Sequence, residues 1–194
     1  MTTRLSGTRL VGLTGNLASG KSTVLACLAR CGAQTLSADA LVRELYTQPL
    51  VRKRLESWFG SAEPEQVARA VFRSAADRQK LERFLHPKVW RLIQKRLAAC
   101  PVGWAVVEVP LLFETGWDKR MDLTVVVAGS SATLPARLQA RGLTPQTYRR
   151  RLKAQGPEAE KIRRADVVIL NEGSTRALQA KARRLYKALT TFYA

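Results

Sequence analysis

The chain has 194 residues, of which 33 are Lys or Arg and 15 are Asp or Glu, so its net charge is +18. Hydrophobic residues make up 46% of the sequence, an ordinary value for one globular domain with a small inserted subdomain. No apolar run reaches the roughly eighteen residues of a membrane span, which argues against a membrane partner. The N-terminal residues carry no apolar signal core, and we therefore expect a cytoplasmic protein.

The basic residues are scattered in short runs, at 52–54, 149–151, 163–164 and 183–184. A charge of +18 fits polyanionic substrates, and it also fits nucleic acid. A surface that binds nucleic acid is expected to carry one continuous basic stripe interleaved with aromatic residues, and the sequence has no such stripe. We expect a solvated basic surface and no specific nucleic-acid partner.

The first predicted elements surround a glycine-bearing loop. Residues 9–14 form a short apolar run typical of a strand, and apolar residues within 23–30 are spaced as on one face of a helix. The intervening sequence fits G-x-x-x-x-G-K-[ST] at every fixed position. Its residues are Gly15, Asn16, Leu17, Ala18, Ser19, Gly20, Lys21 and Ser22, followed by Thr23. A strand, this loop and a helix together predict a phosphate-binding site, whereas a chance match in an ordinary turn is much less favoured.

The residue types of this loop suit ATP. Gly15 and Gly20 lack Cβ, so the backbone can adopt positive φ and approach a ligand closely. Successive N–H groups and the N-terminus of the next helix then form an anion-binding nest. Lys21 supplies positive charge to the β- and γ-phosphates, and the Ser22 hydroxyl is placed to ligate a magnesium ion, Mg²⁺.

A second strand is predicted over 33–37, and Asp39 follows its carboxyl end. Ligands of open α/β sheets sit outside the carboxyl ends of strands, so we expect Asp39 on the same rim as the loop. The alternative is that Asp39 caps a helix over 40–46, and both roles can coexist.

Residues 49–99 are predicted to be helical, with breaks at Gly60, Pro64 and Pro87. Helical spacing of apolar residues is present over 50–59, 65–72, 77–85 and 88–98. This block is too long for a simple crossover between strands, so it predicts an inserted helical subdomain over 45–100.

The second half of the chain returns to alternating strands and helices. Strands are predicted over 104–109, 122–127 and 167–171, and helices over 131–141, from 144, over 158–164 and over 174–189. This alternation predicts a doubly wound parallel sheet of about five strands with helices on both faces. The core would comprise 8–44, 101–141 and 165–194, with 142–164 as a lid bounded by Gly142 and Gly156. Glu108, inside an apolar strand, is either a carboxylate satisfied by an Arg or an active-site group.

Together these motifs resemble the dephospho-coenzyme A kinase family, in order and spacing, across nearly the whole chain. The resemblance is carried by the residues 12–15, 19–23, 38–39, 59–60, 85–87, 110–114, 137–138 with 141, 151–152 with 155, and 165–166 with 171. It implies a P-loop kinase with a core, a helical substrate domain and a lid. Such an enzyme moves the γ-phosphoryl group of ATP to the ribose 3′-hydroxyl of dephospho-coenzyme A.

The resemblance also implies roles for individual residues. Asp39 matches the catalytic aspartate, and Arg141 matches a lid arginine near the nucleotide, so Asp39, Lys21 and Arg141 form the implied catalytic set. The implied acceptor-side residues are His86, Pro110, Leu111, Leu112 and Glu114. The chain departs from the family pattern at Ser37, at 16–18 and at 62–66.

Three alternatives remain beside this kinase, which we expect to be a monomer or a weak homo-oligomer. Another small-molecule or nucleoside kinase would explain the loop but not the Pro110 to Glu114 stretch. A P-loop nucleic-acid-binding protein would explain the charge but not its scattering. A non-catalytic homologue is suggested by the departures, but the chain retains Lys21, Ser22, Asp39 and Arg141.

Overall fold

The computed structural model of the chain describes residues 7–99, 103–129, 134–139 and 155–192, together with residues 142, 144 and 148. The described residues form two compact units. One is Ser37–Ala99, here called the helical unit. The other, here called the core unit, contains the described residues before and after that segment.

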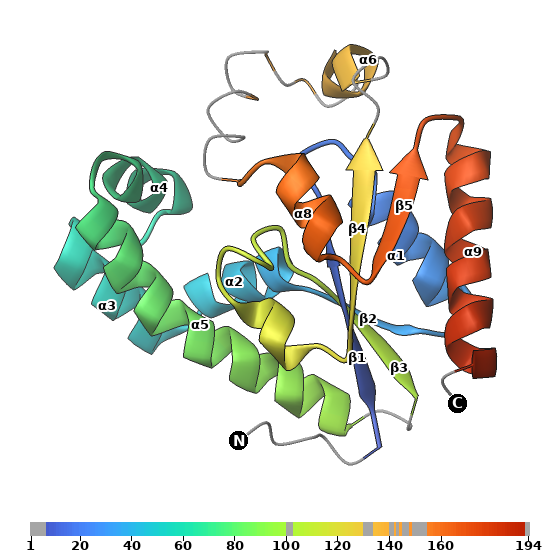
Figure 1. Cartoon of the computed structure of the whole chain (residues 1–194). Coiled ribbons are helices and arrows are strands. Elements are labelled where there is room, and N and C mark those ends of the chain that lie inside the picture. The colour runs from blue at the N-terminus through green and yellow to red at the C-terminus, as the bar shows by residue number, and fades with distance from the viewer. Residues whose placement is uncertain are drawn as a thin grey trace. The chain divides into compact units, whose positions relative to one another are not determined.

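A five-stranded sheet organises the core unit, in the order β2-β3-β1-β4-β5 (Figure 1). Its strands are β1 (Arg9–Thr14), β2 (Gln34–Ser37), β3 (Trp104–Glu108), β4 (Leu123–Gly129) and β5 (Val167–Asn171). The pairs β1–β3, β1–β4 and β4–β5 are parallel, with Leu13 opposite both Glu108 and Val125. The central position of β1 brings its carboxyl end, and the loop that follows it, to the middle of the sheet edge.

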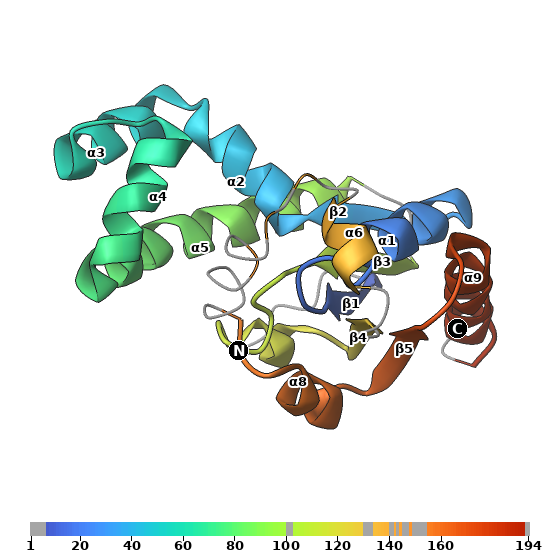
Figure 2. The same ribbon diagram turned by 90° about the horizontal axis from the view of Figure 1, so that it is seen from above.

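Helices cover both faces of this sheet, as the view from above shows (Figure 2). Helices α1 (Lys21–Arg30) and α9 (Thr175–Phe192) pack on one face, and α8 (Glu158–Arg164) packs against β4 on the other. A short 3₁₀ helix, Trp117–Arg120, precedes β4, and α6 (Leu134–Gln139) follows it. The predicted three-layer α/β fold is therefore confirmed.

The core lies mainly between the sheet and the pair α1 and α9. Buried aliphatic side chains of β1, β4 and β5 meet those of both helices there, including Val24, Leu28, Leu178 and Leu185. Strands buried on both faces read as continuous apolar runs, which is why β3 and β4 were recognisable in the sequence. Each fully buried Val or Leu contributes about 1.5–3 kcal/mol, so this layer fixes the position of α1 and of the loop before it.

The helical unit consists of α2 (Ala38–Tyr46), α3 (Pro49–Phe59), α4 (Pro64–Arg73) and α5 (Ala75–Ala98). Helix α3 ends at Gly60 in the left-handed conformation, φ +72°, and Pro64 occupies the first turn of α4. Both breaks follow the prediction, because Gly tolerates positive φ and Pro lacks only an N–H that is unpaired in a first turn. The unit begins at Ser37, whereas the sequence had suggested a subdomain from residue 45.

The predicted break at Pro87 is wrong, because α5 runs without interruption from Ala75 to Ala98. A proline inside a helix frees the carbonyl group four residues earlier, here that of Arg83. Both Arg83 and Pro87 are exposed, so water can satisfy that carbonyl. The flanking Leu85 and Val89 are buried where α5 packs against its neighbours in the unit, and this packing holds the helix together.

Two further predictions concern the part of the chain after β4. The helix expected over 131–141 is described only as α6, and the helix expected from 144 lies almost wholly outside the described residues. Among the helices of the described residues, none combines the length and the apolar content that crossing a bilayer requires.

Candidate active site

The loop between β1 and α1 has the backbone that its glycines predict. Gly15 has φ +145° and Gly20 has φ +109°, both in the region that favours glycine. A Cβ at Gly15 would overlap the carbonyl oxygen of Val127, and one at Gly20 would lie 2.5 Å from Asn171 Nδ2. Ala18 also has positive φ, +63°, so the loop holds one non-glycine residue in a strained conformation.

Lys21 is held at the centre of this loop. Its Nζ donates hydrogen bonds to the carbonyl oxygens of Gly15, at 2.8 Å, and Asn16, at 2.9 Å, and the residue is 8% exposed. The loop therefore curls around a buried ammonium group whose position is fixed by the backbone. A fixed positive charge beside several backbone N–H groups is the arrangement that binds a polyphosphate.

The N-terminus of α1 is open to an anion. Gly20 is its N-cap, no side chain caps it, and no acidic residue occupies its first turn. The first N–H groups of a helix have no acceptor within the helix, and the helix dipole favours negative charge at this end. Ser22, in the same turn, is exposed.

Two buried polar atoms of the loop lack a hydrogen-bond partner among the described residues, Asn16 Oδ1 and Ser19 Oγ. A buried hydroxyl without a hydrogen-bond partner destabilises the folded state by roughly 1–3 kcal/mol, so its presence requires a physical reason. The Ser19 hydroxyl could donate a hydrogen bond to a phosphate oxygen of a bound nucleotide. The donor set of the loop therefore fits a nucleoside triphosphate.

Three side chains from outside the loop support it, and the sequence pattern did not single them out as site residues. Asn171, at the end of β5, donates from Nδ2 to the Ser19 carbonyl at 2.7 Å. Gln155 accepts a hydrogen bond from the Leu17 N–H at 3.0 Å. In the sequence, Asn171 and Gln155 were noted only as residues that match the family pattern. The one sequence signal that could have placed Asn171 near the loop is that it ends a strand on the loop side of the sheet.

The third side chain is Arg137, on α6. Its Nη2 donates to the Asn171 carbonyl oxygen at 2.9 Å, while its Nη1 is buried without a partner among the described residues. A Cβ at Gly129 would lie 3.3 Å from both Arg137 Nη1 and the Cα of Ser19, so this guanidinium lies beside the loop. Arg141, the predicted lid arginine, lies outside the described residues.

The segment after β3 is tied to α8 by a buried charge. Lys161 Nζ lies 3.0 Å from Glu114 Oε1, and the Lys161 side chain is 2% exposed. Glu114 Oε1 also accepts a hydrogen bond from the Gly156 N–H at 2.8 Å. The carbonyl of Pro110 accepts from Thr14 Oγ1 at 3.2 Å, which joins this segment to the end of β1. Helix α8, expected to belong to a lid, is thus fastened to the core unit.

Leu111 and Leu112 differ in their surroundings. Leu111 is half-buried, whereas Leu112 is 0% exposed. The Leu112 side chain packs directly on Gly12 of β1, since a Cβ added at Gly12 would lie 2.9 Å from Leu112 Cδ2. We assign Leu112 to packing against β1 instead of the acceptor contact that the resemblance implied. Glu108 ends β3 and is half-buried.

Asp39 and His86 belong to the helical unit. Asp39 is the second residue of α2 and is exposed. The N-cap of α2 is Ser37, so the interpretation of Asp39 as a helix cap is wrong: the helix begins at Ala38, two residues earlier than the sequence indicated. His86 is a half-buried residue of α5.

A central parallel strand, a glycine-bearing loop around a buried lysine, and an uncapped helix N-terminus define the class of P-loop nucleotide-binding proteins. Comparison with known proteins narrows the class. A family model described as dephospho-CoA kinase matches residues 9–177. The curated dephospho-CoA kinase of Symbiobacterium thermophilum is 37% identical over 195 residues, which cover 93% of this chain and 81% of the relative. The chain belongs to the dephospho-CoA kinase family, as its motifs predicted, and it is therefore a kinase.

Solved structures agree with the fold. TT1252 from Thermus thermophilus is 34% identical, with a TM-score of 0.85 over 95% of this chain and 99% of that chain. The dephospho-CoA kinase from Campylobacter jejuni has a TM-score of 0.69 over 96% of this chain and 100% of that one. Its 22% identity supports the fold alone.

Proposed function

We propose that this kinase transfers the γ-phosphoryl group of ATP to the ribose 3′-hydroxyl of dephospho-coenzyme A, giving coenzyme A. The observation that carries the proposal is the loop around Lys21 in a chain of the dephospho-CoA kinase family. The loop accounts for the nucleotide, and membership of the family accounts for the acceptor.

Residues of the core unit bind the polyphosphate. Backbone N–H groups of the loop and of the first turn of α1 donate to phosphate oxygens, and the Lys21 ammonium neutralises charge on the β- and γ-phosphates. Asn171 and Gln155 hold the loop in shape through the Ser19 carbonyl and the Leu17 N–H. Little of this arrangement has to reorganise during transfer, and such preorganisation is the main source of catalysis in phosphoryl transfer.

The exposed Ser22 hydroxyl is a hard oxygen ligand at the position where Mg²⁺ would be held. No group of three or more His, Cys, Asp or Glu in the described parts of the chain could hold a metal ion by itself. That fits Mg²⁺, which commonly takes one or two protein ligands and completes its shell with water and substrate phosphates. When bound, the ion would neutralise charge on the β- and γ-phosphate oxygens.

Asp39 is the proposed catalytic carboxylate. It would orient the acceptor hydroxyl in line with the γ-phosphorus and accept its proton. Its exposure leaves the carboxylate accessible to a substrate, and no capping duty competes with this role. The proposed acceptor-side residues are His86, Pro110 and Leu111, whereas the Glu114 carboxylate is already engaged by Lys161 and Gly156.

Two parts of the proposal rest on the resemblance alone. Arg141, which lies outside the described residues, would contact the nucleotide, and the lid predicted over 142–164 would close over ATP. Within that lid α8 is fastened to the core unit through Lys161 and Glu158, so the closing part would be the residues before α8.

Turnover with a panel of acceptors tests the proposal. Purified protein is incubated with Mg-ATP and with dephospho-coenzyme A, adenosine or AMP, and ADP release is measured. We expect acceptor-dependent ADP release with dephospho-coenzyme A only, and a large fall in its rate in Lys21→Met. Faster turnover with adenosine or AMP would overturn the proposal in favour of a nucleoside or nucleotide kinase.

A further inference from the structure

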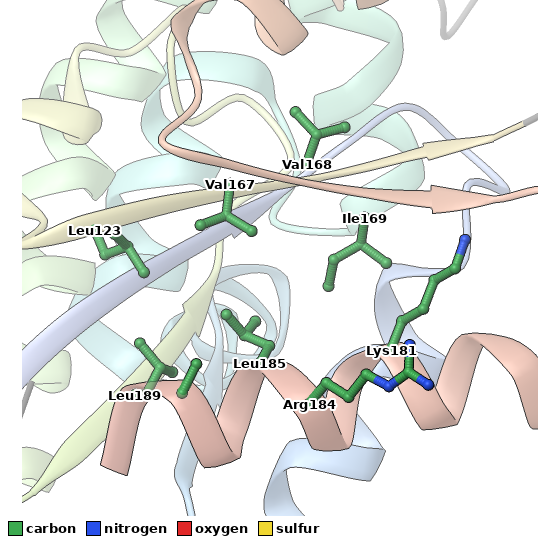
Figure 3. Close-up of a pocket in the computed structure, with 9 residues that line it drawn as sticks. Leu123, Val167, Val168, Ile169, Lys181, Arg184, Leu185 and Leu189 are labelled. Carbon is green, nitrogen blue, oxygen red and sulfur yellow. The ribbon is translucent and has the colours of Figure 1, made fainter. Parts of the chain in front are cut away.

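An apolar cavity of about 380 Å³ opens between the edge strand β5 and helix α9, and no residue of the phosphate-binding loop lines it (Figure 3). Its walls share aliphatic side chains and two long basic ones: Leu123, Val167, Val168, Ile169, Lys181, Arg184, Leu185, Ala188 and Leu189. Binding pockets for small molecules run from roughly 300 to 1,000 Å³, so this cavity is at the small end of the range. None of its residues belongs to the site described above.

The cavity has a polarity along its length (Figure 3). Leu123 and Leu189 lie at one end, and both basic side chains lie toward the other, with the Lys181 ammonium extended to β5 and the Arg184 guanidinium lying along α9. Lys181 Nζ donates to the Leu170 carbonyl oxygen at 2.6 Å, which holds its charge at the edge of β5. Arg184 is exposed, and within the described residues it forms no ion pair with a carboxylate.

The surrounding helix strengthens this charge. Helix α9 carries five basic residues and no acidic residue over its 18 positions. An aliphatic cavity that ends at two cations, on a helix without carboxylates, is complementary to an amphiphilic anion. A neutral apolar ligand would leave the cations unused, and a nucleic acid would leave the aliphatic walls unused.

We propose that this cavity binds a medium-chain fatty carboxylate, with the alkyl chain along Leu123, Val167, Leu185 and Leu189. The carboxylate lies at Arg184, and the Lys181 ammonium adds positive charge at the same end of the cavity. Arginine suits this head group because its planar guanidinium can donate two parallel hydrogen bonds to a carboxylate.

Calorimetric titration of the full-length chain with hexanoate, octanoate and decanoate tests whether the alkyl chain binds along the aliphatic walls of the cavity. Burial of each further methylene should tighten binding about fourfold until the cavity is filled. Decanol, which lacks the charge, and decyltrimethylammonium, which reverses it, should bind more weakly than decanoate. Equal affinities across the three carboxylates, or no saturable binding, would overturn the proposal.

Variants of two adjacent arginines distinguish specific binding of the carboxylate head group from general attraction of an anion to a basic protein. Arg184 lines the cavity, whereas Arg183 does not and is close enough to Cys31, the C-cap of α1, to interact with it electrostatically. Arg184→Gln should lower decanoate affinity by up to about fivefold, as for an exposed ion pair, and Arg183→Gln should leave it unchanged. An equal loss in both variants would show that only net charge matters.

Filling the cavity provides an independent test. Ala188 is half-buried on its wall, and Ala188→Phe should abolish decanoate binding. Ala188→Leu serves in its place if the melting temperature shows that the larger side chain prevents folding. Decanoate binding that survives in a folded filled variant would place the ligand elsewhere and contradict the proposal.

Discussion

The ammonium of Lys161 lies 3.0 Å from the carboxylate of Glu114, and the lysine side chain is almost wholly inaccessible to water. This pair joins α8 to the segment after β3. The same carboxylate oxygen accepts the Gly156 N–H, and Gln155, one residue earlier, accepts the N–H of Leu17 in the phosphate-binding loop. A short stretch before and within α8 therefore connects the loop with the Pro110 to Glu114 segment.

Removal of the buried lysine should destabilise the core unit. Lys161→Met leaves the Glu114 side chain, which is 25% exposed, without its counter-ion, and we expect a loss of about 2–4 kcal/mol in the free energy of unfolding. Arg52→Gln is the control, because both side chains of its pair with Glu63 are exposed and loss of that pair should cost about 1 kcal/mol or less. Urea unfolding measures both. Equal losses of unfolding free energy in the two variants would contradict a special role of buried Lys161 in stability.

Gly20 should not accept a side chain. Gly20→Ala combines an unfavourable φ of +109° with a Cβ 2.5 Å from Asn171 Nδ2, so Asn171 must leave the Ser19 carbonyl. Gly116→Ala is the matched control, because Gly116 has φ +69° and no atom within 4 Å of the added Cβ. We expect Gly116→Ala to cost about 1–2 kcal/mol and Gly20→Ala clearly more, with weaker ATP binding in the latter alone. A similar cost and normal ATP affinity in both would contradict the packing role of Gly20.

Lys21 should act in turnover more than in folding. Lys21→Met removes the charge that the carbonyls of Gly15 and Asn16 position at the loop centre. We expect the turnover number to fall about 10²-fold or more, in line with the loss of other transition-state donors, while the circular dichroism spectrum is retained. Lys187→Met, an exposed lysine on α9, controls for the loss of one charge. Normal turnover in folded Lys21→Met would remove the loop from the mechanism.

Asp39→Asn should separate catalysis from helix stability. Loss of a general base typically costs about 10²- to 10⁴-fold, so turnover should fall on that order while ATP still binds. Asp77→Asn is the control, because Asp77 also lies in the first turn of a helix of the same unit. Each variant should lose only about 0.3–1 kcal/mol of stability, from the weaker interaction with the helix dipole. Near-normal turnover in Asp39→Asn would direct the search for a base to Glu108.

The loop and the strands were predictable because their signals are local. Eight contiguous residues define the loop, and the apolar runs of β3 and β4 report burial on both faces directly. The position of Asp39 just after β2 was predictable for the same reason, and its catalytic role stays a prediction. Its interpretation as a cap failed because helix ends depend on backbone geometry that composition fixes only to within a residue or two.

The supporting side chains could not be predicted because their roles arise only when distant segments meet. Nothing near Lys161 in the sequence indicates burial, and its partner Glu114 comes from another segment. Arg137 beside the loop and Gln155 on the Leu17 N–H depend in the same way on the order of the strands. Pro87 shows the opposite case, in which tertiary packing of α5 overrides a strong local signal.

Identification of the reaction product tests the central claim most directly. The protein is incubated with Mg-ATP and dephospho-coenzyme A, and the product is examined by tandem mass spectrometry and ³¹P NMR. The account predicts one added phosphoryl group, present as a monoester on the 3′-oxygen of the ribose, and far less of this product in the Lys21→Met variant after the same time. A phosphoryl group on the pantetheine half, or ADP formed while dephospho-coenzyme A stays unchanged, would contradict it.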